Sequence, residues 1–133
     1  MQYGYFDNEK REYVIDNVAL PCSWTNYWGV EDMAAFINHT AGGYLFYKTP
    51  EYHRISRFRG NGVPMDRPGF YVYIRDNEKK DYHSISWQPV AKDLSKAKYR
   101  CRHGLSYTVY ESEYDGLASS QTMVIPRGEN VLL

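Results

Sequence analysis

Apolar and polar residues alternate along this chain in short runs, and turn-forming residues separate the runs. Residues 70–75 place Phe, Val and Ile at every second position, with Tyr, Tyr and Arg between them. A period of two residues is typical of a β-strand. Shorter runs at 43–47, 55–59 and 83–87 are further strand candidates, and we expect 98–103 to lead directly into a final hairpin. Many short strands separated by turns predict an all-β fold, an antiparallel β-sandwich.

The clearest local signal is the Asp115-Gly116 pair, which lies between strand-like runs at 105–114 and 117–126. An Asp-Gly pair accepts the positive φ angles of a type I′ turn, whose twist matches that of the flanking strands. We expect this hairpin to be apolar on both faces at its base and polar near its turn, as in a stacked sheet with a protruding turn. The two-residue loop predicts four facing pairs: Tyr114 with Leu117, Tyr110 with Gln121, Thr108 with Met123, and Tyr107 with Val124.

Three segments allow more than one structure. Residues 30–37 fit the spacing of a helix, but they also fit a strand that enters a turn at 38–43. Residues 91–99 fit either a short helix or a charged loop. The final residues, 129–133, resemble the opening of a further apolar strand, although they also fit a strand that completes a sheet. The first alternative predicts that the chain is a single, truncated domain.

Composition narrows the class of protein. Lysine plus arginine equals aspartate plus glutamate at 16 each, so a net charge of zero gives no general attraction to nucleic acid or to an anionic membrane. The N-terminus mixes charged with apolar residues, unlike a secretory signal, and no run reaches the length of a membrane span. Two cysteines, Cys22 and Cys101, favour reduced thiols over a single disulfide. We therefore expect a cytoplasmic protein.

Candidate chemistry is sparse. Aromatic residues make up 17% of the chain, with 14 tyrosines, and tyrosine suits both half-buried strands and surfaces that contact sugars. The four histidines are scattered, and only Cys101 and His103 are spaced to share one face of a strand. A zinc site needs three or four protein ligands, so we expect no metal. The sequence contains no nucleophile motif and no glycine-rich phosphate loop, so no catalytic residue is assigned.

The segment 57–69 carries the most suggestive chemistry. It interleaves arginines with glycines, prolines, an asparagine and an aspartate. Arginine offers planar, bidentate donors, so such a loop can bind sugar hydroxyls or phosphate. The alternative is a structural connection in which arginine–aspartate pairs hold the turn. The candidate substrate-binding residues are Arg59, Asn61, Asp66 and Arg67.

Short motifs follow one another in order along nearly the whole chain: Gly4-Tyr-Phe-Asp7, Arg11-Glu-Tyr-Val-Ile15, Trp24-Thr-Asn-Tyr27, Ala41-Gly-Gly-Tyr44, Asp66-Arg-Pro-Gly69, Tyr71-Val-Tyr-Ile-Arg-Asp76, Ser84-Ile-Ser-Trp-Gln-Pro-Val90 and Arg102-His-Gly-Leu-Ser-Tyr107. This ordered set resembles the N-terminal region of glycoside hydrolase family 94 phosphorylases. Within that family, the motifs that begin at Asp66 and Ser84 are more similar to those of chitobiose phosphorylases than to those of cellobiose phosphorylases.

The resemblance implies both a fold and an activity. Residues 1–133 would form part of a larger antiparallel super-sandwich, which in the family precedes a helical linker and a catalytic (α/α)6 barrel that this chain lacks. Family members are homodimers that cleave a β-linked disaccharide (chitobiose or cellobiose) with inversion and release a sugar 1-phosphate, a glycosyltransferase activity. Inorganic phosphate is the co-substrate and an aspartic acid in the barrel is the general acid, so no other cofactor is expected. The 133 residues alone are expected to be inactive.

Two other functions fit the composition, a free-standing carbohydrate-binding module and a structural interaction domain without catalysis. A binding module predicts exposed coplanar aromatic rings, whereas a part of a phosphorylase predicts exposed apolar sheet surface and no sugar affinity. One residue departs from the family pattern, because the resemblance leads us to expect tryptophan where His83 stands. This exchange costs apolar burial if the site lies in the core, and stacking area if it faces a sugar.

Overall fold

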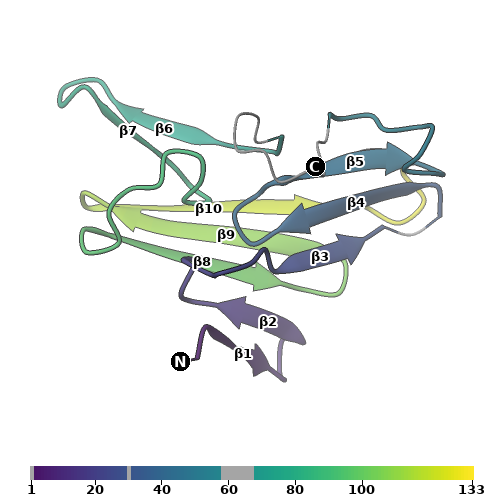
Figure 1. Cartoon of the computed structure of the whole chain (residues 1–133), viewed down its shortest axis with the longest axis horizontal. Helices are drawn as coiled ribbons and strands as arrows, with labels where there is room; N and C mark the ends of the chain where they lie inside the picture. The colour runs from purple at the N-terminus through teal and green to yellow at the C-terminus, as the bar shows by residue number, and fades with distance from the viewer. Residues whose placement is uncertain (1, 30, 58–67) are drawn as a thin grey trace.

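A computed structural model describes residues 2–29, 31–57 and 68–133. These residues form strands, turns and loops and contain no helix, so none of them forms a helix that could cross a membrane. The predicted all-β class is confirmed. Ten strands occur in the described part of the chain (Figure 1): β1 (Gly4–Asp7), β2 (Glu12–Ile15), β3 (Thr25–Trp28), β4 (Met33–Asn38), β5 (Gly43–Tyr47), β6 (Tyr73–Asp76), β7 (Asp81–Ser84), β8 (Ala97–His103), β9 (Tyr107–Tyr114) and β10 (Leu117–Val124).

Five strands form the larger sheet, in the order β1-β2-β8-β9-β10, and each neighbouring pair is antiparallel. Its pattern is clearest in β8, where Ala97, Tyr99, Cys101 and His103 are buried and the residues between them are exposed or partly exposed. Because successive side chains of a strand point to opposite faces, the sheet presents one face to the core and one charged face to solvent.

The β9–β10 hairpin has the predicted turn and register. Asp115 and Gly116 have φ angles of 52° and 80°, as a type I′ turn requires. The observed register contains all four predicted pairs, from the pair beside the turn to the one at the base of the hairpin. Residues 98–103, which the sequence predicts to lead into this hairpin, form most of β8, and β8 pairs with β9.

The smaller sheet contains β3, β4 and β5 in that order, all antiparallel. The segment 30–37, which by sequence fits a helix or a strand, contributes most of β4. Met33, Ala35 and Ile37 are buried there and the residues between them are partly exposed, which is strand alternation. β5 coincides with the strand predicted at 43–47.

The predicted strand at 70–75 is correct only from Tyr73 onward, where β6 begins. Phe70 uses its backbone groups elsewhere. Its N–H donates to the carbonyl of Ala41 (2.9 Å), and its carbonyl accepts from the side-chain amide of Gln121 (3.1 Å). These contacts tie the start of the predicted strand to the two larger sheets instead of to a strand neighbour.

The predicted strand at 83–87 ends early as well, because β7 stops at Ser84. The chain turns back at this point. The Trp87 N–H donates to the Ser84 carbonyl (3.3 Å), and the Ser84 hydroxyl donates to the Trp87 carbonyl (2.6 Å). The local turn therefore replaces the last three residues of the predicted strand.

The strand predicted at 55–59 is wrong over residues 55–57, and residues 58 and 59 lie outside the described part of the chain. Ile55 and Ser56 form a bend in which both N–H groups donate to the carbonyl of Leu45. The neighbouring Arg54 makes a single β-bridge with Phe46. One carbonyl that accepts two donors cannot build a regular ladder.

The two remaining ambiguous segments form loops. Residues 91–96 contain turns but no helix, and β8 begins directly after them. Residues 129–133 form no regular strand, but Leu133 and Val124 exchange two backbone hydrogen bonds of 3.0 Å each. The strand-like character predicted for the last residues is therefore present at Leu133 only.

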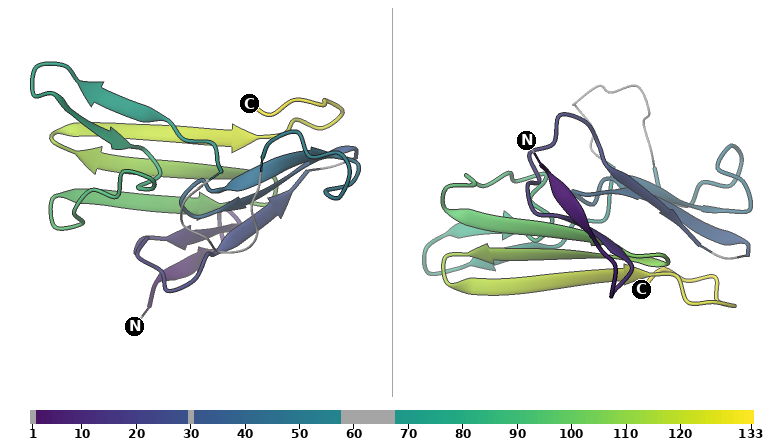
Figure 2. Two further views of the ribbon diagram at one scale, coloured as in Figure 1. Left: turned by 45° about the horizontal axis from the view of Figure 1, so that its top comes forward. Right: turned by 90° about the horizontal axis from the view of Figure 1, so that it is seen from below.

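The smaller sheet packs across one face of the larger sheet, and the β6–β7 hairpin lies over the end of the larger sheet that carries the β9–β10 turn (Figures 1 and 2). Hydrogen bonds link the layers. The Tyr110 hydroxyl donates to the Asn38 carbonyl (2.7 Å), and the Trp28 indole donates to the Thr108 hydroxyl (3.2 Å). The core between the layers contains Ile15, Trp28, Met33, Ala35, Ile37, Ala41, Leu45, Ile85, Cys101, Tyr110, Met123 and Ile125.

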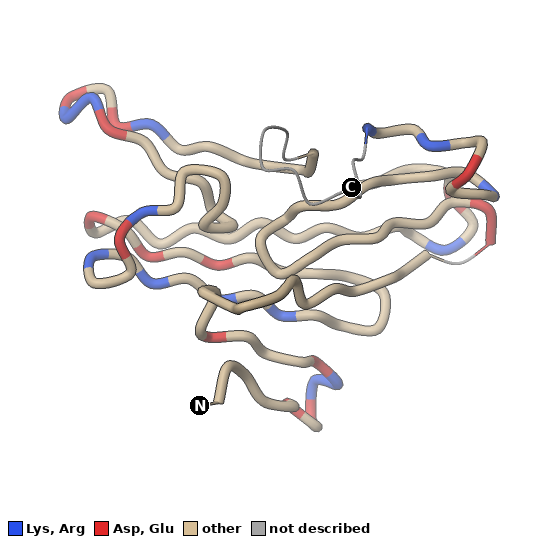
Figure 3. Tube along the Cα trace, viewed as in Figure 1, with Lys and Arg blue, Asp and Glu red and all other residues tan. Residues whose placement is uncertain are grey.

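Charged residues gather at turns and at strand ends, and some lie along the strands of the larger sheet, as Figure 3 shows. The tip of the β6–β7 hairpin carries both signs, and its Lys79 pairs with Asp115 of the β9–β10 turn. This ion pair joins two hairpin tips that lie 36 residues apart in sequence. The described layers thus form the sandwich that the alternation predicts.

Candidate functional site

The four predicted substrate-binding residues, Arg59, Asn61, Asp66 and Arg67, lie outside the described residues. The residues on either side of them are described, and both sides are held by the smaller sheet.

Before the segment, the Ser56 hydroxyl accepts the Leu45 N–H (2.8 Å). After it, the Pro68 carbonyl accepts the Gly43 N–H (3.0 Å), and Gly69 forms a β-bridge with Gly42. The described residues on both sides of the segment therefore lie beside β5 or the turn before it.

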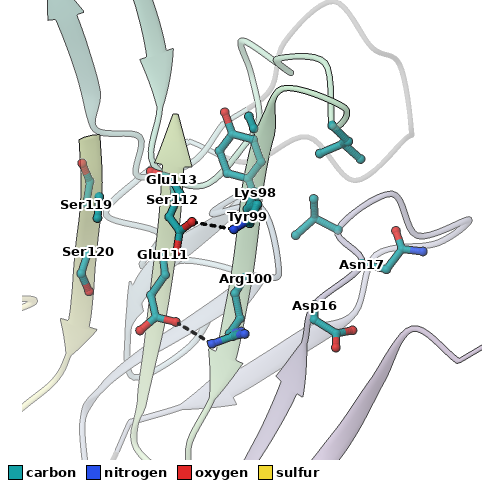
Figure 4. Close-up of a pocket in the computed structure, with 14 residues that line it drawn as sticks. Asp16, Asn17, Lys98, Tyr99, Arg100, Glu111, Ser112, Glu113, Ser119 and Ser120 are labelled. Atoms are coloured by element: carbon teal, nitrogen blue, oxygen red, sulfur yellow. Dashed lines mark hydrogen bonds and ion pairs between the residues drawn. The ribbon is translucent and has the colours of Figure 1, made fainter. Parts of the chain in front are cut away.

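A shallow groove of about 650 Å³ runs over the solvent face of the larger sheet. Figure 4 shows Lys98 and Arg100 of β8 reaching toward Glu113 and Glu111 of β9. The pairs are separated by 3.0 Å and 3.8 Å respectively. Each of these four charges is balanced by its neighbour, and Asp16 adds one further carboxylate to the lining of the groove. Its lining contains neither histidine nor cysteine.

A buried ion pair lies beside this groove and joins β2 to β8 and β9. Glu12 is only 3% exposed and accepts two bonds of 3.1 Å from Arg102 and one of 2.6 Å from the Tyr107 hydroxyl. Arg102 also donates to Glu111 (3.0 Å). Burial acts to lower the pKa of Arg102, but its bond to Glu12 and the two carboxylate charges outweigh burial and raise that pKa. Arg102 therefore stays ionised, and its bonds to Glu12 and Glu111 cross-link three strands.

Cys101 and His103 share the buried face of β8, as predicted, with the sulfur 3.8 Å and 3.7 Å from the two ring nitrogens. Burial raises the pKa of the Cys101 thiol well above its usual value and lowers that of His103 to about 4. The His103 ring bonds to the Thr108 hydroxyl (3.0 Å) and the Trp24 carbonyl (3.3 Å). A neutral thiol beside a neutral imidazole is a structural pair and not an activated nucleophile.

A second cleft, of about 320 Å³, lies between the β6–β7 hairpin and the β9–β10 turn. Asp81 accepts from Lys92 (2.5 Å) and from the Tyr114 hydroxyl (2.6 Å). The bond from Lys92, followed by the bond from Tyr114, holds the pKa of Asp81 far below its usual value. The carboxylate is thus permanently charged near neutral pH and already engaged by two donors.

His83 lines the inner side of this cleft and is 4% exposed. Its ring lies 5.2 Å from that of Tyr114, and burial, assisted by the charge of Lys92, lowers its pKa. The residue that departs from the family pattern therefore belongs to the core and does not form a sugar-facing surface. Its Nε2 atom has no hydrogen-bond partner among the described residues.

In the described part of the chain, the exposed aromatic side chains include members of two groups of contacting rings, and Tyr52, Tyr73 and Tyr82 are exposed as well. On the outer face of the smaller sheet, the Tyr27 ring contacts Phe36 and Phe46 at interplanar angles of 69° and 52°. At the edge of the larger sheet, Tyr13 stacks on Trp24 at 8°, so these two rings cover one another. Tilted or mutually stacked rings differ from the flat, open platform expected of a carbohydrate-binding module.

The described residues contain no group of three or more His, Cys, Asp or Glu side chains placed to hold a metal ion. Sequence reasoning missed the Glu12–Arg102–Tyr107 network and the Asp81–Lys92–Tyr114 network. Their members lie up to 95 residues apart in sequence, so no local pattern indicates them.

Comparison with known proteins places the chain in a family. Residues 11–133 match the glycosyl hydrolase 94 supersandwich domain. The chain is 53% identical over 130 residues to an N,N'-diacetylchitobiose phosphorylase of Vibrio proteolyticus and 52% identical over 130 residues to one of Vibrio furnissii. A solabiose phosphorylase of Paenibacillus borealis is 30% identical over 131 residues.

These alignments cover 98%, 98% and 92% of the chain, but only 16% of each relative, so the chain spans about one-sixth of their length. The layered antiparallel sheets, the ordered motifs and the matched domain agree with one another. The chain belongs to glycosyl hydrolase family 94, and residues 11–133 lie in the supersandwich domain of that family.

Proposed function

We propose that the chain is the supersandwich part of a longer, inverting disaccharide phosphorylase. That enzyme cleaves a β-linked disaccharide with inorganic phosphate and releases a sugar 1-phosphate. We favour N,N'-diacetylchitobiose over cellobiose as the substrate. The observation that carries this choice is the 53% and 52% identity to two chitobiose phosphorylases, against 30% and 31% to phosphorylases named for other sugars.

The chemistry of the described residues supports a non-catalytic role for this part. Glu12, Asp81 and Glu111 are engaged by basic or hydroxyl donors, and Cys101 is buried and protonated. We therefore assign the general acid to polypeptide outside the 133 residues, with phosphate as nucleophile and no further cofactor. The proposed enzyme is a cytoplasmic homodimer.

A chimera tests the proposed function. The matched segment of the Vibrio proteolyticus phosphorylase is replaced by this chain, and phosphorolysis of N,N'-diacetylchitobiose and of cellobiose is measured. We expect the chimera to cleave N,N'-diacetylchitobiose at least ten times faster than cellobiose. A folded chimera without activity on N,N'-diacetylchitobiose, while the parent enzyme is active in the same assay, would refute the proposal.

We further propose that Arg59, Asn61, Asp66 and Arg67 form a loop at the substrate entrance of the complete enzyme. Support comes from the chemistry of these side chains and from the contacts of the described residues on either side of the segment with the smaller sheet. In the chimera, Arg67→Ala should raise the KM for disaccharide or phosphate several-fold, because one bidentate donor is lost. Arg54→Ala is the matched control, since Arg54 is exposed and donates to the Pro50 carbonyl. Unchanged kinetics in Arg67→Ala would remove the assignment.

The competing function is a free-standing carbohydrate-binding module, and the exposed Tyr27 and Trp24 are the residues that would serve it. Calorimetric titration of the 133-residue chain with N,N'-diacetylchitobiose and cellobiose separates the two. The phosphorylase proposal expects no measurable heat of binding. Saturable binding that Tyr27→Ala or Trp24→Ala abolishes would favour the module.

A further inference from the structure

β10 forms one edge of the larger sheet, and its eight residues pair with β9 on one side only. In an antiparallel pair, backbone groups point alternately toward and away from the neighbouring strand. Leu117 closes the two-residue turn opposite Tyr114, so the N–H and C=O groups of Ala118, Ser120 and Thr122 point away from β9. The described residues offer no hydrogen-bond partner to these backbone groups.

This edge lacks the features that normally prevent strand pairing. Natural edge strands are short, charged, interrupted by proline or covered. The opposite edge strand, β1, has four residues and carries Asp7. β10 has eight residues, and none of them is charged or proline. It is therefore a long, uncharged template for one further strand.

One residue already pairs with this edge. After β10, the chain turns at residues 126–129, where the Glu129 N–H donates to the Pro126 carbonyl (3.2 Å) and Gly128 has a φ of 81°. Leu133 then lies opposite Val124, and each donates to the carbonyl of the other at 3.0 Å. Reciprocal bonds of this kind are those of an antiparallel strand pair.

We infer that the free edge of β10 binds one more antiparallel strand, supplied by the polypeptide that follows Leu133 in a longer protein. The inference rests on the proposed function, in which such polypeptide exists. The pairing of Leu133 with Val124 sets both the direction and the register. Each residue added after Leu133 lies opposite the residue one step closer to Leu117, so seven added residues cover the edge.

The register also sets the chemistry of the added strand. Its first residue shares the core face with Met123, which is 4% exposed, and its second shares the solvent face with Thr122. Because side chains alternate across a strand, we expect the core-facing positions near Met123 to be apolar. A second copy of this chain fits the edge less well, because Leu133 already occupies the position opposite Val124.

A cysteine pair in the chimera tests the register. Ser119 faces the fifth residue after Leu133 at a position without reciprocal backbone bonds, where antiparallel strands approach most closely. Ser119→Cys combined with a cysteine at that fifth residue should form a disulfide in most molecules, measured by peptide mass mapping. The control places the second cysteine at the sixth residue, on the opposite face, and should form none. Absence of the first disulfide, or equal yields of both, overturns the inference.

Amide hydrogen exchange tests the occupant. A synthetic peptide of the ten residues that follow the matched segment in the Vibrio proteolyticus phosphorylase is added to the 133-residue chain. We expect the amides of Ala118, Ser120 and Thr122 to exchange at least tenfold more slowly, while that of Gln121, which points toward β9, is unchanged. Unaltered exchange, or protection by self-association of the chain without peptide, overturns the inference. Neither experiment measures phosphorolysis, so a failure of the proposed function would be detected separately, in the phosphorolysis assay of the chimera.

Discussion

At the residue scale, buried polar side chains are matched to specific partners. Thr108 is fully buried and its hydroxyl accepts from the Trp28 indole while it bonds to His103. The His103 Nε2 atom lies 3.3 Å from the Trp24 carbonyl, which can only accept, so Nε2 carries the proton and donates. Nδ1 then accepts from Thr108. Both ring nitrogens of the neutral histidine are thereby bonded, Nδ1 within the larger sheet and Nε2 to the residue that directly precedes β3.

His103 predicts a loss of stability in mild acid. Its pKa is lowered to about 4 in the fold, from 6.5 when unfolded, so between these values only the unfolded chain binds the proton. The free energy of unfolding is therefore highest above pH 6.5 and falls as the pH drops toward 4. Between pH 7 and pH 5 we expect His103 to account for a loss of about 2 kcal/mol, measured by urea unfolding.

The control for this effect is His53→Asn, which removes an exposed histidine and should preserve the pH dependence. His103→Asn should weaken it. An identical pH dependence in the His103 variant and the unmutated chain would contradict the assignment of His103 as a buried, neutral ring.

The Glu12–Arg102 pair predicts a second effect at this scale. Arg102→Ala leaves the nearly inaccessible Glu12 charge with only the Tyr107 hydroxyl, and should cost about 3 kcal/mol of unfolding free energy. Lys98→Ala breaks the ion pair between Lys98 and Glu113, whose two side chains are 83% and 62% exposed. This substitution should change the unfolding free energy by less than about 0.5 kcal/mol. Adding Glu12→Gln to Arg102→Ala should recover part of the loss. Equal effects of the two single variants would show that burial does not distinguish the pairs.

At the element scale, the sequence predicted the structure correctly where residues close together in the chain determine it. The Asp115-Gly116 turn fixes its own register, because the positive φ angles and the two-residue loop leave one pairing. Phe70 shows the opposite case. Its alternation with the following residues is correct for a strand, but its backbone bonds go to Ala41 and Gln121, which only the folded sheets bring near.

Alanine substitutions at two glycines distinguish the cost of backbone strain alone from the cost of strain combined with steric overlap. Gly116 has a φ of 80°, and a Cβ there would meet no atom within 4 Å, so Gly116→Ala should cost about 1 kcal/mol. Gly43 has a φ of 155°, and a Cβ would lie 2.0 Å from the Phe36 carbonyl oxygen and 2.9 Å from the Cα of Ile37. Gly43→Ala should therefore cost about 3 kcal/mol or more. Thermal unfolding of both variants checks the order, and a smaller effect at Gly43 would contradict the register between β4 and β5.

At the scale of the whole molecule, the sequence predicted the layers and the family but not the polar networks. Short alternating runs are enough to predict an all-β sandwich, and the ordered motifs are enough to indicate family 94, whereas the sequence left residues 30–37 open between a helix and the strand β4. The clusters around Glu12 and Asp81 depend on contacts between residues that are far apart in sequence, so no sequence motif indicates them. The assignment of Arg59, Asn61, Asp66 and Arg67 to substrate binding stays a prediction, because these residues lie outside the described part of the chain.

The central claim is that these stacked sheets support a phosphorylase without performing its chemistry. The most direct test uses the 133-residue chain after an NMR spectrum with dispersed amide resonances has shown that it is folded. The chain is incubated with N,N'-diacetylchitobiose and phosphate. Sugar 1-phosphate is then measured beside the active chimera. The account predicts product from the chimera and none from the chain alone. Sustained turnover by the isolated chain would contradict it.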